Sequence, residues 1–385
     1  MSANNFLFKD FKKKRKSKKI QFYLKDLIIS KNEVINSLTQ NYKYSYSKKL
    51  IRKYKKFKFI KIIGMGGSSL GSHAIYDFLK HKINKNFFFI SNLNNTEKFP
   101  KKNFLNLTIS KSGNTLETIA NSNVYIKKNE KNILITENKK SILKKIGLKL
   151  KNEVVAHNDY IGGRYSVLSE VGMLPAELMG LNVKKFKRFN NLIKNKIFYN
   201  SIISNAANIL DLIRIKKFNS VILNYDESSD NFLKWYQQLV AESLGKNGKG
   251  VLPIISSMPK DNHSLMQLYL DGQKSNFYTF FYTQEKFSQK INSQNIPHDI
   301  KFLKKKSLGN ILSSQIIATQ NVFKKKNIPF RSFIIKNRSE ETLGELFSFF
   351  IIETILIAKA LKINPYDQPA VELIKKETKK ILLKT

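Results

Sequence analysis

Residues 59–71 read FIKIIGMGGSSLG, and this stretch contains the local pattern from which the rest of the fold can be predicted. Five mostly apolar residues, 59–63, form a strand-like run, and the glycine- and serine-rich residues after them open a helical stretch. Glycines let the backbone turn tightly, and free N–H groups at a helix start favour an anion. Both the Lys-Ser/Thr of a Walker loop and the GxGxxG spacing of a dinucleotide site are missing. The stretch predicts either a ligand-binding turn or a purely structural one.

The same alternation of short apolar runs and helical periodicity continues along the chain and predicts mainly parallel sheets with helices on both faces. Strands are expected at 59–63, 87–91, 104–110, 132–136, 154–157, 220–224, 251–256, 277–283 and 329–336. In the second half, helices are expected near 231–244, 263–270, 308–325 and 340–361. The pattern indicates an N-terminal helical segment (1–45) and two α/β domains (46–190 and 191–385), the second with a C-terminal helix.

The chain has 385 residues and a formal net charge of +41, yet only seven of its 69 basic residues are Arg. Arg is the side chain that reads phosphates and guanines bidentately. Lys is spread over the whole chain beside abundant Asn, Ile and Phe, which is typical of an AT-biased genome. Zinc-finger, helix-turn-helix, RNP and heptad patterns are absent from the sequence. The sequence therefore argues against a nucleic-acid partner; retention on DNA that weakens steeply with salt would favour one.

Cysteine is absent, which excludes disulfides, Cys-ligated zinc, iron–sulfur clusters and thiol nucleophiles. The four His residues other than His263 show no ligand spacing, so we expect no metal site. No other cofactor is expected either. The most apolar stretch, 346–360, is interrupted by Glu353 and is too short to span a bilayer. We expect a buried helix there and no membrane partner. The first residues do not resemble a signal peptide, which favours a cytoplasmic protein.

A second loop of the same kind, TISKSGNTLET (residues 108–118), follows another predicted strand. Ser110, Ser112 and Thr115 supply hydroxyl donors, and the turn supplies backbone N–H groups, which together can surround a phosphate without a metal. A capped helix start would look similar, because Ser and Thr are good caps. Two such loops at the carboxyl ends of strands favour ligand binding, because open α/β sheets bind ligands there.

Three further stretches carry candidate catalytic side chains. GGRYS (162–166) places Arg164 beside a glycine pair, where a guanidinium can stabilise an oxyanion; a surface Arg on a turn is the alternative. In WYQQLVAESLGK (235–246), Gln238 and Glu242 lie four apart on one helix face. Glu242 can be a general base if it is desolvated, although a helical Glu is more often solvated. In DNHS (261–264), His263 can shuttle a proton or be structural.

These stretches, in this order, resemble the glucose-6-phosphate isomerase family. The resemblance rests on GMGGSSLG, SKSGNTLET, GGRYSVLSEVGMLPAELMG, WYQQLVAESLGKNGKG, DNHSLMQLYLDG and YDQPAVELIKK, which lie between residues 58 and 378. It implies two SIS-type α/β/α sandwich domains with mainly parallel sheets and a homodimer with the active site at the subunit interface. It also implies reversible isomerisation of glucose 6-phosphate and fructose 6-phosphate through ring opening and a cis-enediolate, in glycolysis and gluconeogenesis.

The resemblance also implies roles for individual residues. Glu242 would move the proton between C2 and C1, Arg164 would stabilise the enediolate, and His263 of a second subunit would assist ring opening with Lys375. Residues expected to contact the sugar or its 6-phosphate are Gly67, Ser68, Ser110, Lys111, Ser112, Thr115, Gly163, Gln238 and Gln368. Ala370 and Ile374 stand where two glycines are common in the family, which affects the placement of Lys375.

Two alternatives to this activity remain at the level of sequence. A broader aldose-phosphate isomerase would also accept mannose 6-phosphate, because the SGNT loop resembles such relatives. A non-catalytic SIS protein that senses sugar phosphates would have lost the carboxylate or the His. Glu242 and His263 are both present.

Overall fold

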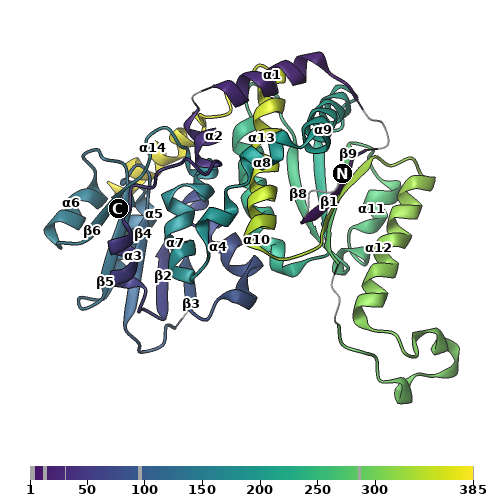
Figure 1. The fold of residues 1–385 in the computed structure, drawn as a ribbon, viewed down its shortest axis with the longest axis horizontal. Helices are drawn as coiled ribbons and strands as arrows, with labels where there is room; N and C mark the ends of the chain where they lie inside the picture. The colour runs from purple at the N-terminus through teal and green to yellow at the C-terminus, as the bar shows by residue number, and fades with distance from the viewer. Residues whose placement is uncertain (1–4, 12–14, 31, 94–97, 285–287, 385) are drawn as a thin grey trace.

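The computed structural model describes residues 5–11, 15–30, 32–93, 98–284 and 288–384, and it contains two separate five-stranded sheets (Figure 1). In the first sheet all neighbouring strands are parallel, and their order is β3-β2-β4-β5-β6. Its strands are β2 (Phe59–Ile63), β3 (Asn86–Ile90), β4 (Phe104–Ile109), β5 (Lys131–Thr136) and β6 (Glu153–Ala156). The central strand β4 is buried along its whole length, as expected for a parallel sheet covered on both faces.

The second sheet has the order β1-β10-β9-β7-β8 and is parallel except for its edge strand β1. Its strands are β1 (Phe6–Lys9), β7 (Asn219–Asn224), β8 (Leu252–Ser257), β9 (Asn276–Thr283) and β10 (Phe330–Ile335). All nine strands predicted from the sequence are therefore present, with ends that differ by one residue at most. The predicted α/β class with mainly parallel sheets is confirmed.

Strand β1 differs from the expectation that residues 1–45 are helical. The sequence FLFK alternates, so Phe6 and Phe8 are buried while Lys9 is exposed, which is the period of a strand. Phe8 packs on Phe333 of β10 and on Phe349, with ring centroids 4.8 and 5.1 Å apart. Helices follow only at α1 (Lys18–Ile29) and α2 (Glu33–Ser37). Residues 1–4, 12–14 and 31 of the predicted segment lie outside the described residues.

Helices cover both sheets and join them. They include α3 (Lys48–Tyr54), α4 (Leu70–Phe78), α5 (Leu116–Tyr125), α6 (Ile142–Lys149), α7 (Glu170–Met179), α8 (Phe189–Lys194), α9 (Lys196–Arg214), α10 (Asp230–Leu244), α11 (Met266–Asp271), α12 (Leu308–Lys325), α13 (Glu340–Ala360) and α14 (Val371–Leu382). Helix α10 packs against α4, which follows the first sheet's strand β2, and against α13. In Figure 1, α10 and α13 stand between the two sheets. The carboxyl end of α10 is thereby held next to the loops of the first sheet.

Helix α13 contains the apolar stretch for which the sequence predicts a buried helix, and this prediction is confirmed. Its residues are buried from Glu340 through Ala358, except Glu341, so the helix lies inside the core rather than on it. The buried Glu353 pairs with Arg331 of β10, which satisfies the charge that interrupts the stretch. In the described part of the chain, no helix is both long and apolar enough to cross a membrane.

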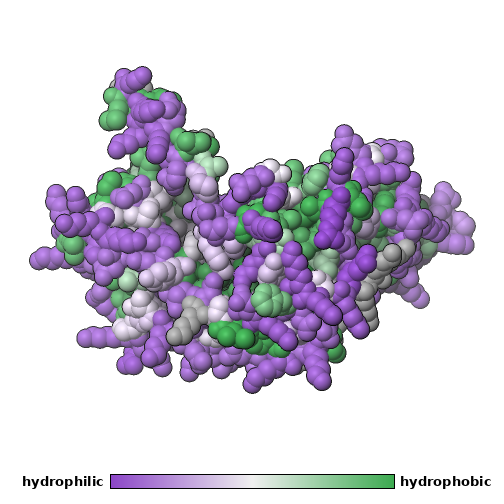
Figure 2. Space-filling view, turned by 90° about the horizontal axis from the view of Figure 1, so that it is seen from above, coloured by the Kyte–Doolittle hydropathy of each residue, from purple (hydrophilic) through white to green (hydrophobic). Residues whose placement is uncertain are grey.

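Helix α14 contrasts with α13, because none of its residues is buried. Leu373, Ile374 and Leu383 are each at least 70% exposed. The face shown in Figure 2 is mostly hydrophilic, with apolar side chains scattered between, as expected for a chain with a net charge of +41. The predicted division of the chain at residues 45 and 190 stays a prediction.

Candidate active site

The buried guanidinium of Arg164 is the centre of the candidate site. Arg164 lies in a 3-10 turn (Gly163–Leu168) after β6, and its side chain is 1% exposed. Its Nη1 donates to Oε2 of Glu242 at 3.0 Å and to Oε1 of Gln368 at 2.7 Å. Three residues that are far apart in the sequence, and that the sequence analysis singled out, therefore meet at one nitrogen atom.

Glu242 lies near the end of α10, one turn after Gln238. Gln238 Nε2 donates to Glu242 Oε1 at 2.8 Å, so the two side chains share a helix face, as predicted. The Glu242 side chain is 32% exposed, with one oxygen held by Gln238 and the other by Arg164. The carboxylate is therefore oriented from two sides but still accessible from outside, which is what a base that reaches a substrate needs.

The glycine loop after β2 (residues 64–68) lies against one side of the group formed by Arg164, Glu242 and Gln238. Gly66 has φ +53°, which favours glycine, and an added Cβ there would lie 2.8 Å from Gln238 Nε2. Gly67 faces the turn that carries Arg164, because an added Cβ would lie 2.6 Å from the Arg164 backbone N. The neighbouring Ser68 is half-buried, and its backbone N–H donates to Met65 O. The glycines thus let the loop approach both the backbone of the Arg164 turn and the Gln238 side chain closely, rather than only forming a turn.

The serine-rich loop follows β4, whose carboxyl end lies next to that of β2. Ser110 is buried, and its Oγ lies 2.9 Å from Thr115 Oγ1 and accepts from the Gly113 N–H at 3.1 Å. Ser112 Oγ accepts from the Asn114 N–H at 3.2 Å. Thr115 stands at the N-terminal end of α5, but its side chain makes no capping hydrogen bond. Its hydroxyl faces the loop instead, so capping does not account for it.

Lys111 connects this loop to the segment before Arg164. Its Nζ donates to the backbone oxygen of Asp159 at 2.8 Å and lies 3.4 Å from Glu137 Oε1. The side chain is 30% exposed, so the ammonium group lies at the surface of the loop. Its positive charge is paired with Glu137, and Lys111 follows directly on Ser110 in the loop.

Two predicted catalytic residues are not brought to this group within one chain. His263 lies in the exposed turn after β8, and its side chain makes no hydrogen bond to the described residues. Lys375 lies on α14 with its side chain 65% exposed, and its Nζ pairs with Glu372 at 2.5 Å. The structure of one chain therefore assembles the Arg164–Glu242 group without either residue.

Several residues that hold Arg164 were not singled out from the sequence. Ser243 and Tyr165 are buried beside the guanidinium, and the backbone oxygens of Pro365 and Asp367 accept from it. Lys246 bonds to the Asp367 carboxylate at 2.7 Å, and this hydrogen bond holds the pKa of Asp367 below its usual range. Ser243 and Tyr165 directly follow Glu242 and Arg164 in the sequence, and this adjacency was the available signal.

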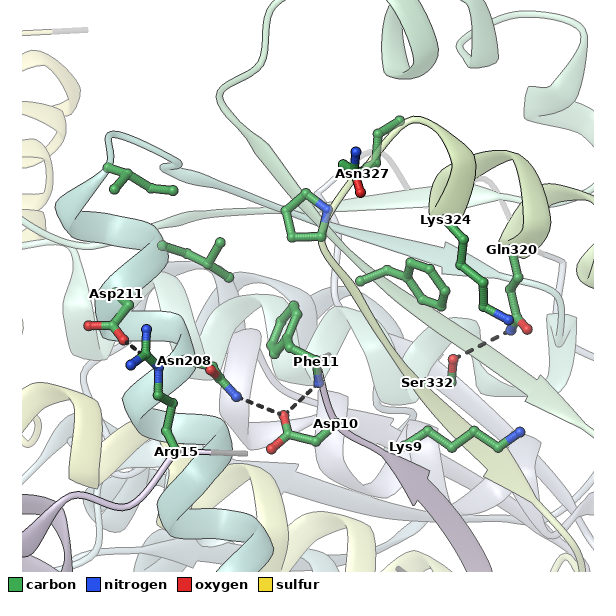
Figure 3. A pocket seen from close by; sticks show the side chains of 15 residues that line it. Lys9, Asp10, Phe11, Arg15, Asn208, Asp211, Gln320, Lys324, Asn327 and Ser332 are labelled. Carbon is green, nitrogen blue, oxygen red and sulfur yellow. Dashed lines mark hydrogen bonds and ion pairs between the residues drawn. The ribbon is translucent and has the colours of Figure 1, made fainter. Parts of the chain in front are cut away.

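A cavity of about 490 Å³ lies elsewhere, between β1, α9 and α12 (Figure 3). It is lined by Phe11, by the Arg15–Asp211 ion pair and by residues at the start of β10, and it contains none of the predicted site residues. Among the described residues, no group of three or more His, Asp or Glu side chains is arranged to hold a metal ion.

The comparisons with known proteins agree with one another. The phosphoglucose isomerase family matches residues 12–264. Glucose-6-phosphate isomerase of Methanocaldococcus jannaschii is 34% identical over 343 residues, which cover 83% of this chain and 83% of that protein. The enzyme of the same name from Mycoplasmopsis synoviae is 32% identical over 357 residues, which cover 83% of this chain and 81% of that protein.

Two solved structures share the fold at lower identity. A hypothetical protein of Thermus thermophilus has a TM-score of 0.80 at 21% identity and 94% coverage of both chains. A glucose-6-phosphate isomerase of Chlamydia trachomatis has a TM-score of 0.68 at 19% identity, covering 98% of this chain and 81% of that one. This likeness agrees with the predicted α/β fold with mainly parallel sheets. The family match and the extent of the two sequence relationships establish that the chain belongs to the phosphoglucose isomerase family.

Proposed function

We propose that this chain catalyses the reversible isomerisation of glucose 6-phosphate and fructose 6-phosphate. The observation that carries the proposal is the 3.0 Å contact between Nη1 of the buried Arg164 and the carboxylate of Glu242. A base and a fixed positive charge at one point are what an aldose–ketose isomerisation requires. The reaction moves protons and leaves the overall oxidation state unchanged, so its chemistry calls for no redox cofactor.

Glu242 acts as the general base in this proposal. Its carboxylate removes the proton from C2 of the open-chain aldose, and the negative charge passes to oxygen in a cis-enediolate. Arg164 stabilises that charge while the hydroxyl proton of O2 is transferred to O1, and Glu242 returns the carbon-bound proton to C1 to give the ketose. A positioned base contributes roughly 10²–10⁴ in rate, and one oxyanion donor contributes about 3 kcal/mol. Gln238 and Gln368 hold the two groups in register and contact the sugar.

The 6-phosphate binds at the loop after β4 in this proposal. Ser110, Ser112 and Thr115 offer hydroxyl groups, the turn offers N–H groups, and Lys111 offers a positive charge. Gly67, Ser68 and Gly163 line the sugar between this loop and Arg164. The neighbouring positions of β2 and β4 support this arrangement, since both loops leave the same edge of one sheet.

Ring opening needs an acid and a base that the Arg164–Glu242 group does not supply. We infer that His263 of a second copy of the chain serves here, with Lys375 near the ring oxygen. The exposed position of His263 supports this arrangement, because a side chain that completes a neighbouring site must face outward. The functional unit in this proposal is a homodimer with its active site at the subunit interface, acting in the cytoplasm in glycolysis and gluconeogenesis.

The two alternatives, an isomerase that also accepts mannose 6-phosphate and a non-catalytic sugar-phosphate sensor, gain no support from the comparisons.

The assay that tests the proposal follows the conversion of fructose 6-phosphate, coupled to glucose-6-phosphate dehydrogenase. We expect turnover by the parent and a loss of about 10²–10⁴ in kcat for Glu242→Gln. Glu227→Gln, at an exposed helix-start position, serves as the matched control and should keep full activity. A folded parent that binds the sugar phosphate without turning it over would overturn the proposal in favour of a sensor.

A further inference from the structure

Every N–H group of Arg164 is paired within the chain. A guanidinium has five N–H donors and no acceptor. Nε donates to Ser243 Oγ at 2.9 Å, and Nη2 donates to the backbone oxygens of Pro365 and Asp367 at 2.5 and 3.0 Å. The two hydrogens of Nη1 account for the remaining donors, because they point to Glu242 and Gln368. Three donors therefore face the protein interior, and only Nη1 faces the site.

The inward-facing donors belong to a closed ring of hydrogen bonds. Ser243 Oγ lies 2.7 Å from the hydroxyl of Tyr165, and this hydroxyl lies 3.1 Å from the same Pro365 oxygen that accepts from Arg164 Nη2. The guanidinium can only donate and the carbonyl can only accept. Both limbs of the ring therefore lead from Arg164 to Pro365: one through Ser243 and then Tyr165, the other directly from Nη2.

The ring is sealed from water. Ser243 and Tyr165 are both 0% exposed, and Arg164 is 1% exposed. Burial raises the pKa of Tyr165, which keeps its hydroxyl protonated and able to donate to Pro365. The Tyr165 ring also lies 5.2 Å from the guanidinium carbon, so it packs on the charge that its hydroxyl helps to orient. In such surroundings hydrogen bonds strengthen one another, and a missing partner is costly.

We propose that Ser243 and Tyr165 are positioning residues, whose hydroxyl groups lock the guanidinium of Arg164 so that only Nη1 points at the reacting oxygen. This inference rests on the proposed role of Arg164 in stabilising the enediolate. Neither hydroxyl touches the substrate. Their contribution is to the angle and position of a donor, and a misplacement of about 1 Å near the chemistry costs on the order of 100-fold in rate.

The variants that test the ring are Ser243→Ala, Tyr165→Phe and the double variant. Each single change should lower kcat about 10-fold to 100-fold with KM changed less than about threefold, because the lock matters most when charge develops. A ring broken at one point is already open, so the double variant should lose no more activity than the worse single variant. A transition-state analogue with a planar anionic group should weaken in parallel with kcat, whereas glucitol 6-phosphate should bind unchanged.

Tyr278→Phe is the matched control, because Tyr278 is also a buried tyrosine whose hydroxyl donates to a backbone oxygen, that of Tyr269. The kcat of Tyr278→Phe should remain that of the parent, although its loss of thermal stability should be comparable to that of Tyr165→Phe. Parental kcat in Tyr165→Phe, or multiplicative losses in the double variant, would overturn the ring. Arg164→Met separates this result from failure of the proposed function: if that variant keeps its kcat, the role of Arg164 itself is wrong.

Discussion

Gly67 and Gly163 are in direct contact, although they lie on separate loops far apart in the chain. A Cβ added to Gly67 would lie 2.2 Å from the carbonyl carbon of Gly163, far closer than any real contact allows. A Cβ added to Gly163 would instead meet its nearest neighbour, the Gly67 Cα, at an ordinary 3.8 Å. The contact is therefore one-sided: only one of the two glycines is required for it to form.

Gly67→Ala and Gly163→Ala should consequently differ, although the chemical change is the same. We expect Gly67→Ala to separate the loop after β2 from the Arg164 turn, with a loss of about 1–3 kcal/mol in unfolding free energy. Gly163→Ala should stay within about 0.5 kcal/mol of the parent. Thermal and urea unfolding of both variants checks this difference, and equal losses would contradict the one-sided contact.

Arg164→Lys should remove most of the activity although the positive charge remains. An ammonium has three donors on one atom and cannot reach Ser243, the loop carbonyl groups and Glu242 together. We expect kcat to fall about 10²–10³-fold, the effect of losing one oxyanion donor. Steady-state kinetics at saturating fructose 6-phosphate measures this change; retained kcat would mean that charge alone is sufficient.

The proposed contribution of His263 from a second subunit can be tested by mixing two inactive proteins. In a heterodimer of Glu242→Gln and His263→Ala chains, one of the two sites has both native residues. Unfolding and refolding the two at equal amounts should therefore restore about a quarter of the parental activity by random assortment of C2 dimers. Glu242→Gln refolded alone is the control. If the mixture stays as inactive as its components, His263 acts within its own chain or not at all.

The Thr115 hydroxyl is predicted to bind phosphate rather than cap α5. Thr115→Val keeps the shape and removes the hydroxyl, so KM for fructose 6-phosphate should rise about 5-fold to 10-fold, the value of one hydrogen bond near 1 kcal/mol. Thr118→Val, within α5, is matched to it, because Thr118 Oγ1 is buried and has no hydrogen-bond partner among the residues that the structure describes. That control should leave KM unchanged. If Thr115→Val lowers the free energy of unfolding but leaves KM unchanged, the hydroxyl is structural.

Lys187 gives the fold a pH dependence. Its side chain is buried, and its Nζ donates to the backbone oxygens of Ser37 and Leu168, which ties α2 to the end of the Arg164 turn. Desolvation lowers the pKa of Lys187 to about 7, with Glu170 opposing the shift. A neutral amine still has two N–H groups, and these match the two oxygen atoms.

Between about pH 7 and the ordinary pKa of lysine, the unfolded chain therefore binds a proton at Lys187 that the folded chain has released. The free energy of unfolding should rise with pH in this window by at most about 1.4 kcal/mol per unit from this group. Lys187→Met has no such proton and should show a smaller slope. Urea unfolding of both proteins at about pH 7 and pH 9 measures the difference, and equal slopes would contradict the lowered pKa.

Local patterns were sufficient to predict the strands, α10 and the buried helix α13, because periodicity and burial are properties of neighbouring residues. Strand β1 was missed because four residues of alternating Phe are too short a signal beside a helical stretch. Tyr165 and Ser243 were missed for a different reason. Their hydroxyl groups can be recognised as partners of Arg164 only when the fold has brought Pro365, which is distant in the sequence, next to them. His263 and Lys375 are not brought to Arg164 and Glu242 within one chain, and in the proposed dimer it is the second copy that supplies His263.

The full set of partners around Arg164 has a consequence for affinity. A sugar oxygen that reaches Nη1 in the proposed reaction takes a place that the protein's own oxygen atoms already occupy. Binding then exchanges one hydrogen-bond acceptor for another, so this contact adds little binding free energy in the ground state. The larger stabilisation arises once the enediolate carries its full negative charge. The same exchange releases Glu242 from the guanidinium when the sugar arrives. The base is thus restrained in the empty protein and freed by the molecule on which it acts.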